Sequence, residues 1–88
     1  MTIGFPNRSR SYDADHGRIR FWGHDRTVEV TFLLDRSALL KLVPSAEGTE
    51  ASLLAAFDKA RERVLEAAMR VYLPRQNERF YVLSDKDF

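Results

Sequence analysis

The segment from Asp13 to Gly17 places two carboxylates, an imidazole and a glycine next to one another. This composition is typical of a calcium-binding loop. A loop of that type needs a third Asp or Asn at its fifth position, glycine at the sixth and a bidentate Glu at the twelfth. Here Gly17 stands at the fifth position and Asp25 at the twelfth. The mismatch favours a polar hairpin turn over a cation site.

The two histidines offer the other candidate chemistry. His24 precedes Asp25, but adjacent residues in a turn rarely point toward one another, and no Ser or Cys nucleophile lies nearby in the sequence. His16 falls at the opposite end of the same predicted strand, about 15–20 Å away, so the two histidines cannot share a metal ion. The chain has no cysteine, which excludes thiolate sites. We therefore expect no catalytic residues, no metal, no cofactor and no enzyme.

Arginines are frequent in the first third of the chain, close to Phe21 and Trp22. Basic side chains beside aromatic rings on a sheet can bind single-stranded nucleic acid. The formal net charge is only +1, so attraction to phosphate would have to come from local clustering. The candidate nucleic-acid contacts are Arg8, Arg10, Arg26 and, in a second basic segment, Arg75.

Trp22 is the residue that a structural role explains least well. Strand alternation places it on the face opposite Ile19 and Phe21. Large aromatic side chains on a partly charged face are enriched at protein interfaces. The predicted binding surface consists of Trp22, Arg18, Arg20 and Leu33. A protein partner or a second copy would bind there.

Intramolecular cover is the alternative explanation of Trp22. The segment Ile3–Phe5, or residues after the last strand such as Phe88, would fold over the ring. The strand predicted at Phe80–Leu83 is apolar on both faces, which indicates that the second face of the sheet is not simply open to water. Both explanations stay open at the level of the sequence.

The elements that position these residues follow from a change of hydrophobic period. Apolar residues alternate from Tyr12 to Leu34, which predicts three strands in a meander. A turn centred on His24-Asp25 would set Phe21 opposite Val28 and Arg20 opposite Glu29.

The preceding hairpin would set Tyr12 opposite Ile19 and Asp13 opposite Arg18. These pairings give Arg18 and Arg20 acidic partners, which favours a solvated charged face over a nucleic-acid surface.

Helical spacing replaces alternation in the second half. Asp35 is a predicted N-cap of a short helix over Arg36–Val43, which Pro44–Gly48 ends. Thr49 is a second predicted N-cap, and the helix that it begins runs to about Leu73, where Pro74 blocks continuation. At about 1.5 Å per residue this helix would span about 36 Å, enough to overhang the sheet and offer surface to a partner.

The chain of 88 residues is 44% hydrophobic and 31% charged, values that fit one globular domain over residues 1–88. The predicted fold is α+β: an antiparallel sheet of a three-stranded N-terminal meander plus a C-terminal strand, packed against one long helix and one short helix. The start of the chain has no apolar segment of signal-peptide type, and no run approaches the ~18 apolar residues of a membrane span. We expect a cytoplasmic protein that does not bind membranes.

Two segments resemble a family of short bacterial proteins known only as a domain of unknown function. They are Ile3-Gly4-Phe5-Pro6-Asn7-Arg8-Ser9-Arg10-Ser11-Tyr12 and Arg20-Phe21-Trp22-Gly23-His24-Asp25. The resemblance continues through Ala55-Ala56-Phe57-Asp58 to the closing Asp87-Phe88. It implies a stand-alone α+β domain of about this length, with no assigned activity, ligand or site residue. Protein interaction or self-association is therefore the favoured function, and a nucleic-acid-associated accessory or regulatory role is the alternative.

Overall fold

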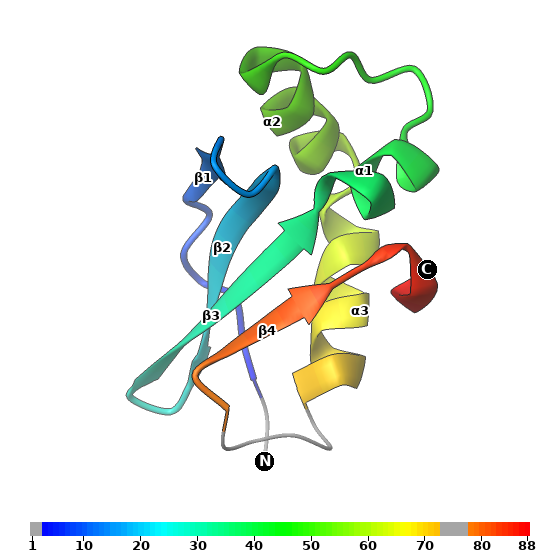
Figure 1. Cartoon of the computed structure of the whole chain (residues 1–88). Coiled ribbons are helices and arrows are strands. Elements are labelled where there is room, and N and C mark those ends of the chain that lie inside the picture. The colour runs from blue at the N-terminus through cyan, green and yellow to red at the C-terminus, as the bar shows by residue number, and fades with distance from the viewer. Residues whose placement is uncertain (1–2, 73–77) are drawn as a thin grey trace.

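The computed structural model describes residues 3–72 and 78–88. Four strands form one sheet, and three α-helices pack on it in a second layer; Figure 1 shows this arrangement. The elements in chain order are β1 (Arg10–Asp13), β2 (Arg18–Asp25), β3 (Val28–Asp35), α1 (Arg36–Leu42), α2 (Glu50–Lys59), α3 (Arg61–Tyr72), β4 (Phe80–Leu83) and the 3-10 helix η1 (Asp85–Asp87). The predicted α+β class is confirmed, but the sheet is mixed rather than antiparallel.

Alternation along the strands builds the core between the two layers. Alternate residues of β2 and β3 are buried, namely Ile19, Phe21, Gly23, Val30, Phe32 and Leu34, because successive side chains of a strand point to opposite faces. Phe21 and Phe32 stack with their ring centroids 5.3 Å apart. Phe57 of α2 packs on Phe21 at 5.2 Å, and Tyr81 of β4 packs on Phe32 at 5.5 Å. An aromatic cluster thus joins three strands to the helices.

The first hairpin has the predicted register. Tyr12 pairs with Ile19 and Asp13 pairs with Arg18. The turn between the strands contains Gly17 at a φ of +62°, and the amide of Asp15 donates to the Asp13 carboxylate. The interpretation of this segment as a polar hairpin turn is therefore confirmed.

The predicted register of the second hairpin is wrong. The turn lies at Arg26-Thr27, two residues beyond the predicted centre, so that Phe21 pairs with Phe32 and Arg20 with Leu33. Gly23 directly precedes the predicted turn centre at His24-Asp25 but lies inside β2, where a close neighbour rather than a turn requires glycine. Because the turn moves by a whole number of strand periods, every side chain of β2 and β3 stays on its predicted face.

The last strand joins the sheet beside β3 and runs parallel to it, giving the order β1-β2-β3-β4. The predicted antiparallel arrangement of β4 is therefore wrong. A parallel neighbour needs a crossover that returns the chain to the starting end of the sheet. The helices supply this crossover: α1 and α2 follow the end of β3, and α3 runs back along the sheet (Figure 1).

Two helices replace the single long helix that the periodicity predicted. Ala60 has φ −99° and ψ 11° and ends α2, and α3 begins at the next residue. The apolar stripe passes through this break without interruption, so the pattern alone does not reveal it. The prediction of one 36 Å helix that overhangs the sheet is therefore wrong.

One of the two predicted helix N-caps is confirmed and the other makes no capping hydrogen bond. Thr49 accepts from the Ser52 amide as predicted. Asp35 stands at the N-cap of α1 without a side-chain cap bond, because its carboxylate accepts from Arg18 instead. Within residues 3–72 and 78–88, no helix combines the length and hydrophobicity needed to cross a membrane.

Candidate interaction surface

The sheet has a second face that points away from the helices, here called the open face. The pairing of the strands sets its side chains in rows across the sheet. Its members are Ser11, Asp13, Arg18, Arg20, Trp22, His24, Glu29, Thr31, Leu33, Asp35, Phe80 and Val82. All four residues of the predicted binding surface are among them. Within the described part of the chain, every helix packs on the opposite side of the sheet.

Apolar side chains form the middle of the open face. Trp22 pairs with Thr31, and Thr31 pairs with Phe80. In the neighbouring row Leu33 pairs with Val82. Phe80 is 49% exposed, and the other three apolar side chains are half-buried. The result is an apolar band that runs from β2 to β4, and Phe80 is its most exposed part.

The N-terminal segment Ile3–Phe5, one of the two candidates for covering Trp22, packs on the helical side of the sheet instead. Phe5 lies 5.7 Å from the Phe32 ring, in the core. Gly23, which is buried, faces this segment: a Cβ there would lie 2.8 Å from Phe5 Cε1 and 3.0 Å from Ile3 Cδ1. The glycine is needed because Ile3 and Phe5 occupy the space of a side chain. Cover of Trp22 by Ile3–Phe5 is therefore wrong.

The C-terminal residues also lie on the helical side. The carbonyl of Phe88 accepts from Lys41 of α1, and the carbonyl of Asp87 accepts from Arg70 of α3 at 3.1 Å. Phe88 itself packs against the core cluster. The second segment proposed as cover for Trp22 therefore leaves the open face uncovered as well.

One end of the open face is polar and surrounds a cleft of about 350 Å³ beside Phe80. Arg18 donates to Asp35 at 2.8 Å, and Arg20 lies 3.8 Å from Asp13. Glu29 is not the partner of Arg20, as the predicted register required, but both arginines have carboxylate partners. The hydrogen bond from His16, 2.9 Å long, lowers the pKa of Asp13. This end is a network of opposite charges rather than a basic patch.

At the other end of β2, His24 Nε2 lies 4.0 Å from Glu29. The backbone of His24 exchanges two hydrogen bonds with Gly4, and its Nδ1 atom is buried without a partner in the part of the chain that the structure describes. His16 lies in the turn at the far end of β2, so the predicted separation of the two histidines is confirmed. Across residues 3–72 and 78–88 no three His, Asp or Glu side chains are grouped as metal ligands.

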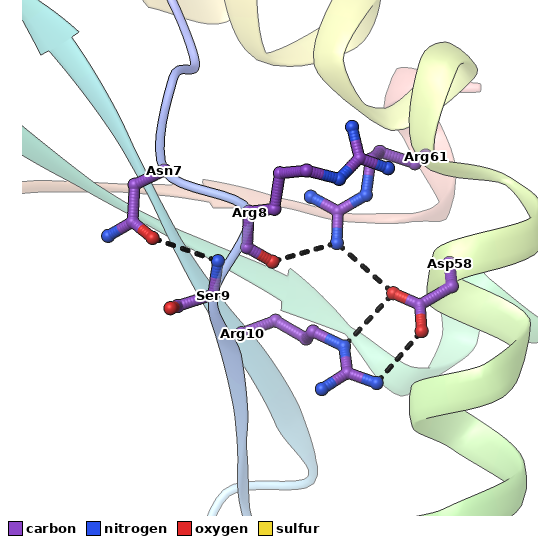
Figure 2. Close-up of polar contacts among 6 residues, drawn as sticks. All are labelled: Asn7, Arg8, Ser9, Arg10, Asp58 and Arg61. Atoms are coloured by element: carbon purple, nitrogen blue, oxygen red, sulfur yellow. Dashed lines mark hydrogen bonds and ion pairs between the residues drawn. The ribbon is translucent and has the colours of Figure 1, made fainter.

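The arginines proposed as nucleic-acid contacts do not converge. Arg10 makes a two-pronged ion pair with Asp58 of α2, at 2.9 and 2.8 Å (Figure 2). Arg10 pairs with Phe21 in the middle of β2 and Arg8 precedes it by two residues, whereas Arg26 lies beyond the end of β2, in the β2–β3 turn. Arg75 lies outside the described residues. Arg10 and Arg61 together lower the pKa of Asp58, with the Arg10 hydrogen bond as the larger cause.

Three features of the surface and its support were not foreseen from the sequence. The exposure of Phe80 depends on which side of the sheet the helices cover. The contacts of Asp58 join residues 48 positions apart. Tyr72, 4% exposed, donates to Asp25 over 47 positions, and this hydrogen bond raises the Tyr72 pKa to about 12. The alternation in β4 was the only available signal for Phe80, and the sequence contains no local signal for the other two.

The chain matches one protein family and is similar to one solved structure. The family described as "Protein of unknown function (DUF1488)" matches residues 3–84. The chain belongs to this family. A crystal structure of a DUF1488 protein of unknown function from Shewanella loihica PV-4 is similar, with a TM-score of 0.82, 15% sequence identity and 94% of each chain covered. That likeness shows a shared fold. No curated protein matches the chain. DUF1488 thus describes a short domain whose function is not known.

Proposed function

We propose that this DUF1488 protein is a non-enzymatic interaction module that works through the open face of its sheet, and that its partner there is a second copy of the chain. The observation that carries the proposal is the apolar band of Trp22, Leu33, Val82 and Phe80, over which no helix of the described residues lies. Contiguous apolar surface without intramolecular cover is typical of a protein–protein contact. A central aromatic side chain with a polar rim is the usual composition of such a contact.

The size of the open face is at the lower limit for a contact between two folded domains. With about 4.8 Å between strands and about 3.3 Å per residue, two strands of eight residues and two of four cover roughly 380 Å² in projection. Small specific interfaces bury roughly 600 Å² per partner, so the contact includes side chains at the rim of the face as well. The apolar band extends over three strands, from β2 to β4, and this breadth suits contact with another protein surface.

The charges around the band favour a second copy as the partner. Three arginines, Arg18, Arg20 and Arg79, stand on this side of the sheet or line its cleft, against Asp13, Glu29 and Asp35. These six side chains together carry no net charge, so two copies do not repel one another. Glu29 lies at the opposite end of the face from Arg18 and Arg20, so a two-fold axis that runs across the strands brings Glu29 of one copy toward Arg18 and Arg20 of the other.

The shifted pKa values support a role without catalysis. Asp13 and Asp58 have pKa values below the ordinary range, which makes each carboxylate a weaker base. Tyr72 has a pKa of about 12, which makes its phenol a weaker acid near neutral pH. A catalytic acid or base is more effective with a pKa near the working pH. Each of these groups is instead engaged in a contact between elements of the fold.

Nucleic-acid binding is the alternative function. Its support is the arginine content near β1 and β2, and its weakness is that Arg10 is paired with Asp58 while Arg26 lies apart from it in the β2–β3 turn. It predicts affinity for DNA or RNA that falls steeply as salt rises. An absence of binding at low salt removes it.

Light scattering over a range of concentrations tests self-association. We expect twice the monomer mass for the wild type, and the monomer mass for Trp22→Ala and Phe80→Asp. Val28→Asp is the matched control, because Val28 is 62% exposed but belongs to the opposite side of the sheet. A wild type that stays monomeric, or a mass that is the same in all variants, contradicts the proposal.

A further inference from the structure

The junction between α2 and α3 carries a second surface, here called the junction pocket. It is a cleft of about 490 Å³ on the helical side of the molecule, apart from the open face. Four basic side chains, Arg8, Lys59, Arg61 and Arg63, and two carboxylates, Asp58 and Glu62, line it. The break at Ala60 forms the pocket, because it brings the end of one helix and the start of the next to the same place.

Arg61 is the fixed centre of the junction pocket. It is 8% exposed, and its guanidinium lies over the Phe57 ring at 4.9 Å. Its Nη2 atom donates to the Arg8 carbonyl at 3.0 Å and to Asp58 at 3.1 Å (Figure 2). Its Nε atom is buried without a partner among the described residues. A positive charge is thus held in one position with little access to water.

Asp58 does not offset the remaining positive charge. Both of its oxygens accept from Arg10, and one of them also accepts from Arg61. One carboxylate therefore balances two guanidinium groups only in part. The arrangement leaves the junction positive before Arg8, Lys59 and Arg63 are considered.

Arg8, Lys59 and Arg63 are exposed cations. No carboxylate of the described chain lies within ion-pair distance of any of the three. Figure 2 shows the Arg8 side chain extending toward Arg61. The Arg8 backbone is tied by its carbonyl to Arg61, so Arg8 is held where its charge adds to that of Arg61. Like charges held together in this way are stabilised by an anion.

We propose that the junction pocket binds the phosphate groups of a small phosphorylated molecule. Arginine is well suited to phosphate, because its guanidinium donates two parallel hydrogen bonds to phosphate oxygens. The cleft volume lies in the range of about 300–1,000 Å³ typical of small-ligand sites. Only Ala60 and Leu65 add apolar surface, and no aromatic ring lines the cleft. The phosphate groups, rather than a stacked base, are therefore the recognised part of the ligand.

Titration with inorganic diphosphate, followed by amide NMR shifts of the labelled protein, tests the junction pocket. We expect saturable shifts around residues 8 and 58–65, and no matching shifts with sodium chloride at equal ionic strength. Arg8→Gln and Arg63→Gln should each weaken binding about tenfold, which corresponds to about 1.4 kcal/mol. Arg26→Gln is the matched control, because it removes an exposed arginine at the distant β2–β3 turn.

Three results would overturn the site. They are shifts that chloride reproduces, shifts scattered over the surface, and affinities that Arg8→Gln and Arg63→Gln leave unchanged. A single-stranded oligonucleotide serves as the second probe. If it binds at the junction while diphosphate does not, the site is not one for a small phosphorylated molecule. The readout does not depend on the open face, so self-association and phosphate binding succeed or fail separately.

Discussion

Asp58 joins three parts of the chain through one carboxylate. It accepts from Arg10 of β1 and from Arg61 of α3, and it belongs to α2. Arg61 in turn holds the carbonyl of Arg8. The sequence did not reveal this network, because its members are far apart in the chain and each is an ordinary charged residue in its own element. By contrast, the face occupied by Trp22 was predictable, since it depends only on alternation within one strand.

Asp58→Asn should destabilise the fold by about 1–2 kcal/mol, because it leaves the nearly buried Arg61 without an anionic partner. The side chain of Asp58 is 45% exposed, which keeps the loss below that of a fully buried ion pair. Denaturant unfolding measures the difference. Glu62→Gln, a neighbouring exposed carboxylate without an ion pair among the described residues, should change the free energy of unfolding little.

The pH dependence of this effect has a defined sign. The pKa of Asp58 lies below its ordinary value of 3.8 in the folded chain. The carboxylate therefore contributes stability above that value and loses it as the pH falls and the folded form takes up a proton. The difference in stability between wild type and Asp58→Asn should shrink below about pH 4. A difference that stays constant to pH 2 would contradict the ion-pair account.

Tyr72 should ionise at a higher pH than an ordinary tyrosine. Its hydrogen bond to Asp25 and its burial raise its pKa to about 12, above the ordinary 10.0. A raised pKa means that Tyr72 stabilises the fold below about pH 10 and that this contribution is lost as pH rises toward 12. Ultraviolet absorbance titration should show one late step in the wild type, and Tyr72→Phe should remove it. A Tyr72 that ionises near pH 10 would refute the Asp25 contact.

Secondary structure was predictable here wherever it depended on local pattern. The meander, its first register and the Thr49 cap follow from alternation and capping chemistry. The second turn was misplaced because glycine is common in turns. Gly23 instead lies within β2, where the missing side chain leaves room for Phe5. The direction of β4 and the break at Ala60 depend on how the helices return across the sheet. The spacing of apolar residues does not indicate the direction of a strand or a break within a continuous apolar stripe.

Gly23→Ala tests the packing of the N-terminal segment on β2. An added Cβ would lie 2.8 Å from Phe5 Cε1, so Ile3 and Phe5 would have to shift out of the core. We expect a loss of about 1–3 kcal/mol in the free energy of unfolding, as for other overpacked cores. Gly4→Ala is the matched control, because a Cβ at Gly4 meets nothing within 4 Å. Equal stability of the two variants would show that the segment packs elsewhere.

The described residues form two layers, so one face of the sheet has no helix of the described chain on it. Three of its strands form a local meander, and the crossover places all three α-helices on the same side. This distribution could not be obtained from the sequence, since apolar residues on both faces of Phe80–Leu83 are also expected for a strand covered on both sides. Because the described helices leave the Trp22 face free, the remaining question is which partner binds there.

Trp22 is the single tryptophan of the chain, so its fluorescence reports on the open face directly. We expect its quenching by acrylamide to decrease, and its emission to move to shorter wavelength, as the protein concentration rises through the range in which the mass doubles. Phe80→Asp should show neither change. Quenching of Trp22 that stays constant while the mass doubles, or that decreases equally in Phe80→Asp, would contradict the claim that two copies meet through the open face.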